Sequence, residues 1–229
     1  MPAFPTTFID DPVTYLGAKP MLLSIGSPAG TLQTPVTVQF TSGQNVTLPL
    51  LRHDGPAAMK QLGWMGADAP PPGTASITQD YPIESCYVLN WASDKVYYTT
   101  LGAAGRVFVT ARLNGCGVII GGDVNSPVVV HANISPAAVF PERVGVNDEN
   151  IQREEKGLAW GRYYAKLAVQ LRNQGIFTND RITVIHPEFY QMLGSFARVF
   201  GVRRMDGWSF YANMDAGGSR ASTKKIWPQ

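Results

Sequence analysis

The sequence predicts an α+β fold in which a mostly antiparallel β-sheet comes first and helices follow it. Two observations support this prediction. Short apolar segments separated by turn residues succeed one another densely over residues 83–133, which is typical of neighbouring antiparallel strands. Over residues 147–200, apolar side chains then recur at helical spacing. We therefore expect a strand-rich core that the later helices cover.

The first third of the chain is expected to add three strands and a short helix. One strand is predicted over 21–25, and alternation of apolar and polar residues over 36–40 and 46–50 predicts a hairpin. Residues 57–65 are predicted to form the short helix. Residues 66–76 include consecutive prolines, which fit neither a helix nor a central strand, so an exposed loop is expected there.

Five strands are predicted in the middle of the chain, over 83–91, 95–100, 106–111, 116–121 and 126–133. The last two are apolar on both faces, so something must cover each face. A long amphipathic helix over 147–175 is expected to supply one cover. The later elements are predicted as a strand over 181–185, a second helix over 187–200, a strand near 208–212 and a frayed basic tail through Lys224 and Lys225.

Length and composition indicate a single globular domain over residues 1–229, of which 45% are hydrophobic and 16% charged. The net charge of +2 argues against nucleic acid as the main partner, because phosphate binding needs clustered basic residues. No apolar run approaches the roughly 20 residues of a membrane span, and the N-terminus lacks a Sec signal pattern. We expect a monomer that is cytoplasmic in the producer or is secreted or injected into a target cell without a Sec signal peptide.

The last two of the five central strands form the most informative stretch. If they fold about a centre between Asp123 and Val124, Cys116 faces His131. Directly opposed residues share a face of the sheet, with Cβ atoms about 4.5–5.5 Å apart. We therefore predict a Cys116–His131 pair. An imidazolium beside a thiol lowers the thiol pKa from about 8.5 into the range of about 3.5–7.5, which yields the nucleophilic thiolate.

The residues before Cys116 fit a catalytic interpretation. Asn114-Gly115 is a turn dipeptide, which leaves backbone N–H groups free to bind an oxyanion. Gly115 and Gly117 remove side chains on both sides, so a substrate backbone can approach closely. The competing interpretation is that a cysteine among valines and isoleucines is simply a small buried hydrophobe.

The histidines, Asp123 and Cys86 each have a structural interpretation beside a possible functional one. His131 alone would be read as a hydrogen-bonded core residue, and His53 is expected to be solvated in a turn. His186 lies at a strand-to-helix junction and is the reserve candidate base. Asp123 is interpreted as a turn residue. Cys86 and His186 could join a metal site with the Cys–His pair, but no CxxC or HxxxH spacing supports one, so no metal or cofactor is expected.

The two cysteines are expected to be free thiols in a reducing compartment, and the alternative is a single Cys86–Cys116 disulfide. A third group should hold the imidazole, as in other nucleophile–base pairs. Thr110, six residues before Cys116, is the candidate, through its hydroxyl or its backbone carbonyl.

The stretch Thr110-Ala-Arg-Leu-Asn-Gly-Cys116, followed fifteen residues later by His131, resembles the Cys–His glutamine deamidase toxins. This is the family of Burkholderia lethal factor and of the cytotoxic necrotizing factor catalytic domain, and the deamidase CheD shares its fold. The family signature is Leu-Ser-Gly-Cys with a downstream histidine, and a threonine stands at the place of Thr110. This chain has Asn114 in place of the serine, so target choice is expected to differ if the serine hydroxyl contributes to substrate binding.

The resemblance implies a β-sandwich core of mixed, mostly antiparallel sheets flanked by two C-terminal helices. It also implies hydrolysis of a glutamine carboxamide in a target protein to glutamate, with a host GTPase or a translation-initiation helicase as possible targets. Cys116 would attack the amide and His131 would transfer protons, with Thr110 completing the site. Leu113, Asn114 and Gly115 would form the oxyanion and substrate-binding stretch.

Three alternatives stay open at this point. Transglutamination, in which an amine replaces water, uses the same groups. A cysteine protease would cleave the backbone of its target. A non-enzymatic β-rich binding module would use Cys116 only for core packing.

Overall fold

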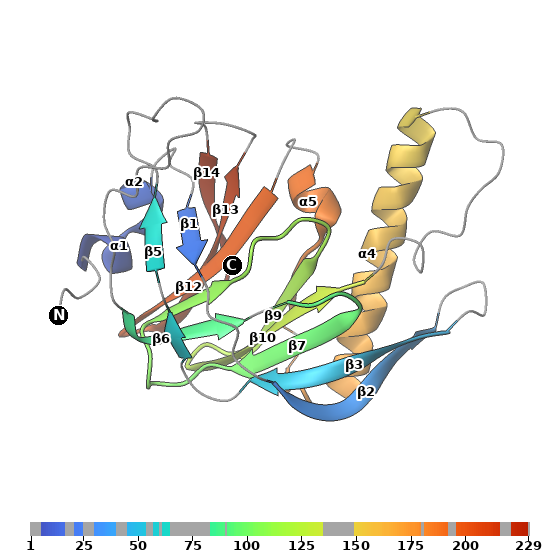
Figure 1. The fold of residues 1–229 in the computed structure, drawn as a ribbon, viewed down its shortest axis with the longest axis horizontal. Helices are drawn as coiled ribbons and strands as arrows, with labels where there is room; N and C mark the ends of the chain where they lie inside the picture. Colours follow the sequence, from blue (N-terminus) through green and yellow to red (C-terminus); the bar gives the residue numbers. More distant parts are fainter. Residues whose placement is uncertain are drawn as a thin grey trace.

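The computed structural model of the chain describes residues 6–16, 21–24, 30–39, 45–53, 57–59, 61–64, 83–89, 91–134, 149–179, 181–191, 196–215 and 221–228. Two six-stranded sheets pack face to face, and a long helix lies against the outer face of one of them (Figure 1). The loop predicted over 66–76 lies outside the described residues.

The first sheet, which we call the hairpin sheet, contains in spatial order β11 (Thr183–Ile185), β9 (Gly117–Asp123), β10 (Ser126–Asn133), β7 (Lys95–Thr100), β3 (Asn45–His53) and β2 (Thr31–Gln39). All neighbours are antiparallel except β3 and β7. The predicted hairpin over 36–40 and 46–50 is therefore confirmed as β2 and β3.

The second sheet contains in spatial order β14 (Ala221–Trp227), β13 (Gly207–Asp215), β12 (Phe196–Arg204), β8 (Val107–Thr110), β6 (Ile83–Leu89) and β4 (Ala57–Met59). Here too one pair is parallel, β6 with β8. A separate antiparallel pair is formed by β1 (Met21–Ser24) and β5 (Gln61–Trp64). Two mixed, mostly antiparallel sheets confirm the predicted α+β fold with a β-sandwich-like core.

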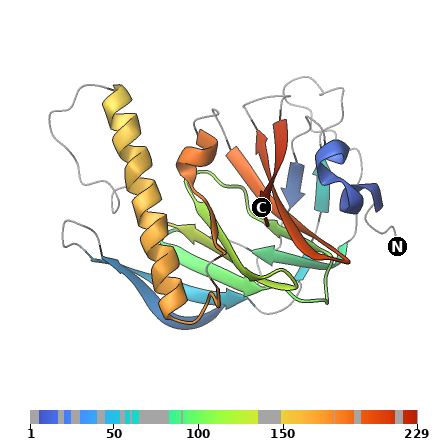
Figure 2. The ribbon, with the colours of Figure 1, turned by 180° about the vertical axis from the view of Figure 1, so that it is seen from behind.

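The helices are α1 (Thr6–Asp10), α2 (Pro12–Leu16), α4 (Glu149–Asn173) and α5 (Pro187–Gln191). The long helix predicted over 147–175 is confirmed as α4. Figure 2 shows α4 on one side of the molecule and β12, β13 and β14 on the other, with β9 and β10 between them. No helix within the described residues is long and apolar enough to span a membrane.

Both faces of β9 and β10 are covered, as their apolar sequences require. Val118, Ile120 and Val129 belong to the cluster between the two sheets. Ile119 and Val130 point the other way, into the cluster that α4 completes. The second sheet therefore supplies one cover and α4 supplies the other.

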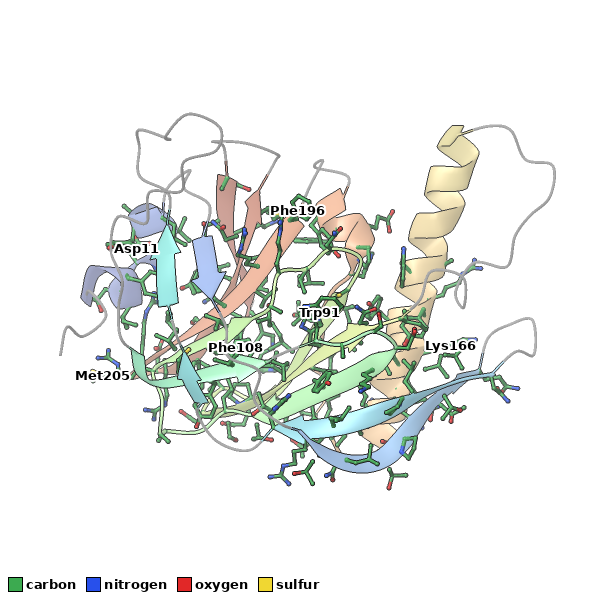
Figure 3. The ribbon with its side chains drawn as sticks, viewed as in Figure 1. Asp11, Trp91, Phe108, Lys166, Phe196 and Met205 are labelled. Carbon is green, nitrogen blue, oxygen red and sulfur yellow. The ribbon has the colours of Figure 1, made fainter. Side chains whose placement is uncertain are left out.

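Helix α4 is also tied to the edge of the hairpin sheet by two side chains. The Lys166 Nζ donates to the carbonyl of Gln39 at 2.8 Å, and the Gln174 amide donates to the carbonyl of Pro35 at 3.0 Å. Figure 3 shows Lys166 beside the β2–β3 hairpin. These contacts occupy backbone acceptors of β2 at the edge of the sheet, where an exposed strand could otherwise pair with another chain.

Four sequence predictions are wrong. The five central strands do not form one sheet, since β6 and β8 belong to the second sheet. Within the helix predicted over 57–65, residues 57–59 form β4 and 61–64 form β5, because pairing with β6 and β1 overrides local helical preference. The helix predicted over 187–200 covers only α5, and Phe196 begins β12. The tail predicted to fray is β14, an edge strand with exposed Lys224 and Lys225 before buried Ile226 and Trp227.

The error at β12 has a simple physical cause. This strand lies between β8 and β13 and is buried on both faces. An apolar run that is buried all round carries no period-2 alternation, so its sequence does not separate a strand from a helix. Pairing with β8 and β13 therefore determines that this segment forms a strand rather than a helix.

Gly117 allows the closest approach between β9 and α4. A Cβ at this position would lie 2.7 Å from the Tyr164 hydroxyl and closer still to the ring. The ring is fully buried, and its hydroxyl donates to the carbonyl of Ala132 at 3.1 Å. The sheet–helix contact therefore depends on a residue without a side chain.

We predict that Gly117→Ala destabilises the protein by about 1–3 kcal/mol, because the buried Tyr164 ring must move. Gly161→Ala is the matched control: among the described residues, no atom beyond its chain neighbours and the backbone of its own helix lies within 4 Å of its Cβ position, and alanine is favoured over glycine in a helix by about 0.5–1 kcal/mol. Urea unfolding of the three proteins measures both effects. Equal unfolding midpoints for Gly117→Ala and wild type would contradict the packing argument.

Candidate active site

The turn between β9 and β10 sets the register of the predicted Cys–His hairpin. Asp123 and Ser126 face each other, so only Val124 and Asn125 lie between the strands. The Asp123 carboxylate accepts a hydrogen bond from the Asn125 N–H at 2.8 Å, as short polar side chains do in turns. Gly122 has a φ of +94° within the strand, a value that favours glycine. The predicted centre between Asp123 and Val124 is therefore wrong.

The corrected register moves Cys116 and His131 apart by two positions. His131 faces Val118, and continuing the pairing by two residues brings Asn133 opposite Cys116. The predicted directly opposed Cys116–His131 pair is therefore wrong. Because the shift is by two residues, both side chains keep the same face. They are diagonal neighbours, whose Cα atoms are typically about 7–8 Å apart.

The three predicted catalytic residues all belong to the layer between the two sheets. Cys116 is part of the apolar cluster there. His131 lies two residues from Val129 on β10, and Thr110 lies two residues from Phe108 on β8; both neighbours belong to that cluster, so strand alternation directs His131 and Thr110 to the same layer. All three side chains are buried. Cys116, His131 and Thr110 thus reach one layer from three different segments.

Thr110 does not hold the imidazole through its hydroxyl. Its Oγ1 donates to the carbonyl of Ala111 at 2.9 Å. Neither nitrogen of His131 has a hydrogen-bond partner within the described part of the chain. The orienting contact predicted between Thr110 and His131 is therefore absent from the described residues.

Burial controls the protonation of both members of the predicted pair. His131 is 0% exposed, and burial lowers its pKa to about 3. Cys116 is 3% exposed, and burial raises its pKa to about 11. The protein at neutral pH therefore holds a neutral thiol and a neutral imidazole. The thiolate–imidazolium pair predicted from the sequence is wrong for this state.

Burial and hydrogen bonding act in opposite directions on the Cys116 thiol. Burial is the larger effect and raises its pKa, whereas hydrogen bonding from the Asn114 backbone and the Asn133 side chain acts to lower it. Hydrogen bonds of this kind stabilise the negative form of an acid. Asn133, which was not singled out from the sequence, thus takes the place opposite Cys116 that was predicted for His131.

The backbone donors predicted to form an oxyanion site are largely engaged. The Leu113 N–H donates to the carbonyl of Ala197 at 2.8 Å, and the Gly115 N–H donates to the Tyr190 hydroxyl at 2.8 Å. Gly115 has a φ of +91°, which confirms that the turn requires glycine there. The donors that point at the sulfur are Asn114 and Asn133, so the prediction for Leu113 and Gly115 as free donors is wrong.

The reserve base His186 lies on the other side of the hairpin sheet. Its ring stacks on Tyr164, with centroids 6.3 Å apart, and Tyr164 belongs to the α4-side cluster. Its Nδ1 is 4.0 Å from a carboxylate oxygen of Glu188. Burial lowers the pKa of His186, and the Glu188 carboxylate opposes that shift. Cys116 belongs to the layer between the sheets, so the sheet separates it from His186.

The remaining polar candidates have structural surroundings. His53 is buried rather than solvated and stacks on Tyr97 with centroids 5.1 Å apart. Both cysteines are free and buried, so the Cys86–Cys116 bridge does not form. Among the described residues, no three His, Cys, Asp or Glu side chains lie close enough together to hold a metal ion.

No model of a known protein family matches this chain, and no curated protein matches its sequence significantly.

We predict that the alkylation rate of Cys116 by iodoacetamide rises with pH toward a midpoint near 11. Asn133→Ala should raise this midpoint further, because the thiolate loses a hydrogen-bond donor. Asn125→Ala, on the exposed turn of the same hairpin, should leave it unchanged. Mass spectrometry of the Cys116 peptide gives the rate at each pH. A midpoint near 8.5 in the wild type would contradict control by burial, and one within about 3.5–7.5 would indicate a neighbouring imidazolium.

We also predict that His131 makes the fold acid-sensitive. The unfolded chain binds a proton on His131 below its ordinary pKa of 6.5, whereas the folded protein does so only near 3. Stability contributed by neutral His131 is therefore present above pH 6.5 and is lost as the pH falls toward 3, by at most about 1.4 kcal/mol per pH unit. His131→Leu should remove this dependence of stability on pH, because leucine does not titrate.

Urea unfolding of wild type and His131→Leu at pH 7.5 and 4.5 tests the prediction. The free energy of unfolding of His131→Leu relative to wild type should rise by about 2–3 kcal/mol from pH 7.5 to pH 4.5. A difference that is the same at both pH values would mean that His131 becomes protonated in the folded protein without penalty.

Proposed function

We propose that this protein is a glutamine deamidase that acts on a target protein, with Cys116 as the nucleophile and His131 as the proton-transfer group. The resemblance of the segment from Thr110 to His131 to the Cys–His deamidase toxins is the starting point. The residues that would carry the reaction are buried in the same layer between the sheets.

The observation that carries the proposal is the difference between the two cysteines. Cys86 is fully buried, its thiol donates to the carbonyl of Tyr87 at 3.4 Å, and burial alone raises its pKa. Cys116 instead receives N–H groups from Asn114 and Asn133, which favour a negative sulfur. The same chain therefore contains one cysteine with the surroundings of a core residue and one with donors suited to a thiolate.

The proposed reaction begins when the Cys116 sulfur attacks the carbonyl carbon of a glutamine carboxamide and its proton passes to His131. The carbonyl oxygen becomes an oxyanion close to the sulfur, which the N–H groups of Asn114 and Asn133 would stabilise. Return of the proton from His131 to the nitrogen releases ammonia and leaves a thioester on Cys116. Water, deprotonated by His131, then hydrolyses the thioester to glutamate and regenerates the thiol. No cofactor enters this scheme.

The burial of the pair sets a condition on this scheme. Cys116 is 3% exposed and His131 is 0% exposed, so the layer must open to admit the carboxamide and then water. Opening would hydrate both groups and move their pKa values back toward 9.0 and 6.5, their ordinary values. Activation is thus coupled to entry of the target.

The same burial favours a second candidate function, a non-enzymatic β-rich binding module. In that case Cys116 and His131 would stay in the closed layer, and the donors on the sulfur would serve only to satisfy polar groups. A transglutaminase or a cysteine protease on the same pair differs in product, since the first attaches an amine to the glutamine and the second cleaves the target backbone.

Proteome-wide mapping of glutamine-to-glutamate changes in cells that express the protein tests the proposal. We expect conversion at specific glutamines with wild type, none with Cys116→Ser, and a rate about 10²–10⁴-fold lower with His131→Ala. Cys86→Ser is the matched control and should retain activity, because Cys86 lacks the donors around Cys116. Equal conversion by wild type and Cys116→Ser would sink the assignment. Cleaved or amine-linked targets would instead identify the protease or the transglutaminase.

A further inference from the structure

Tyr190 joins the turn that carries the proposed nucleophile at two adjacent residues. Its hydroxyl accepts a hydrogen bond from the Gly115 N–H at 2.8 Å and donates one to the carbonyl of Cys116 at 2.8 Å. The hydroxyl has one proton to give and lone pairs to receive one, so both contacts are satisfied at once. The Tyr190 side chain is 0% exposed. A single buried hydroxyl therefore links the N–H of the positive-φ glycine to the carbonyl of the residue that follows it.

The segment that bears Tyr190 also holds both ends of the same turn. Ile185, at the end of β11, pairs with Val118 on β9. Ala197, at the start of β12, forms a bridge with Leu113. Residues 185, 190 and 197 therefore contact, in that order, residue 118, residues 115–116 and residue 113. The two segments run in opposite directions, as in an antiparallel pairing. Helix α5, which lies between α4 and β12 (Figure 1), therefore carries Tyr190 to the middle of this pairing.

The surroundings keep the Tyr190 hydroxyl in its linking state. Burial raises the pKa of Tyr190 well above its ordinary value, against the opposing effect of its hydrogen bonds with the Gly115 and Cys116 backbone. The hydroxyl is therefore protonated at neutral pH and can donate to the Cys116 carbonyl.

We propose that Tyr190 is a positioning residue for Cys116: its hydroxyl fixes the backbone of the Gly115–Cys116 turn and so sets where the sulfur lies relative to its donors. This inference rests on the proposed function for its catalytic consequence, but not for the link itself. Glycine at a positive φ gives the turn little stiffness of its own. Rigidity must come from outside, and displacement of a reacting atom by about 1 Å can cost on the order of 100-fold in rate.

The test uses Tyr190→Phe, which removes the hydroxyl and keeps the ring. Tyr87→Phe is the matched control, because the buried Tyr87 hydroxyl also accepts a glycine N–H, that of Gly102 at 3.0 Å. Iodoacetamide labelling of the full chain is followed by mass spectrometry at both cysteines. Cys86, which is 0% exposed, reports global opening in the same sample.

We expect Tyr190→Phe to accelerate labelling of Cys116 about five- to thirtyfold, as one or two lost hydrogen bonds let the turn open more often. Labelling of Cys86 should stay unchanged, and Tyr87→Phe should label Cys116 at the wild-type rate. On a target glutamine, kcat of Tyr190→Phe should fall tenfold or more with little change in KM. A more exposed but less active cysteine is the signature of lost positioning, which general destabilisation does not produce at one cysteine alone.

Labelling of Cys116 within twofold of wild type in Tyr190→Phe would overturn the proposal, as would an equal rise at Cys86 or in Tyr87→Phe. If Tyr190→Phe does not fold, hydrogen exchange at the Gly115 amide of the wild type decides: protection supports the link and free exchange overturns it. If wild type converts no glutamine, the proposed function fails, and the labelling result still decides whether Tyr190 holds the turn.

Discussion

The chain crosses from the second sheet to the hairpin sheet between Thr110 and Gly117, and this crossing must satisfy its backbone polar groups inside the layer that it traverses. An unpaired buried N–H or carbonyl costs free energy comparable to a lost hydrogen bond. The N–H of Ala111 donates to Leu89, Leu113 exchanges hydrogen bonds with Ala197, and Gly115 donates to Tyr190. The crossing is thus held by partners from two other parts of the chain, Leu89 at the end of β6 and the segment that carries Tyr190 and Ala197.

This constraint explains why the proposed site is built as it is. A crossing segment has no regular neighbours on both sides, so its partners are backbone groups of other segments and, at Gly115 and Cys116, the Tyr190 side chain. The Cys116 sulfur then lies where the crossing joins β9, next to the strand that carries Asn133 and His131. A thiol in the middle of a strand would not be so close to free side-chain and backbone donors.

The sequence determined the fold class well because its signals are local. Alternation at β2 and β3, turn residues between the central strands and the helical spacing of α4 depend on neighbours in the chain. The assignment of strands to two sheets, and the nature of Phe196–Arg204, depend on contacts between distant segments. The face shared by Cys116 and His131 was also predictable, because a shift of two positions keeps a residue on the same face of its strand. The predicted direct opposition of the two residues was wrong, because it depended on the position of the turn at Asp123.

Asn133 and Tyr190 show the two ways in which the sequence-based site was incomplete. The Asp-Val-Asn-Ser stretch at Asp123 carries the signal of a two-residue Asx-type turn, and reading it would have brought Asn133 opposite Cys116. Tyr190 carries no comparable signal. It lies 75 residues from Gly115, and a tyrosine after Pro187 in a short helix is not distinguishable from any other aromatic core residue. Only the pairing of β11 and β12 with the crossing segment brings it there.

The protonation states of Cys116 and His131 have one common cause. Burial is the largest effect on each pKa, and it raises the first and lowers the second, so both groups are held in their neutral forms by the same apolar layer. One event that admits polar groups into the layer would therefore act on both at once, in the directions that favour proton transfer from sulfur to nitrogen. In the proposed deamidase the carboxamide of the target supplies those polar groups. A closed layer would then protect the thiol from modification until the target enters, while Tyr190 and the two N–H donors keep the sulfur in place for that moment.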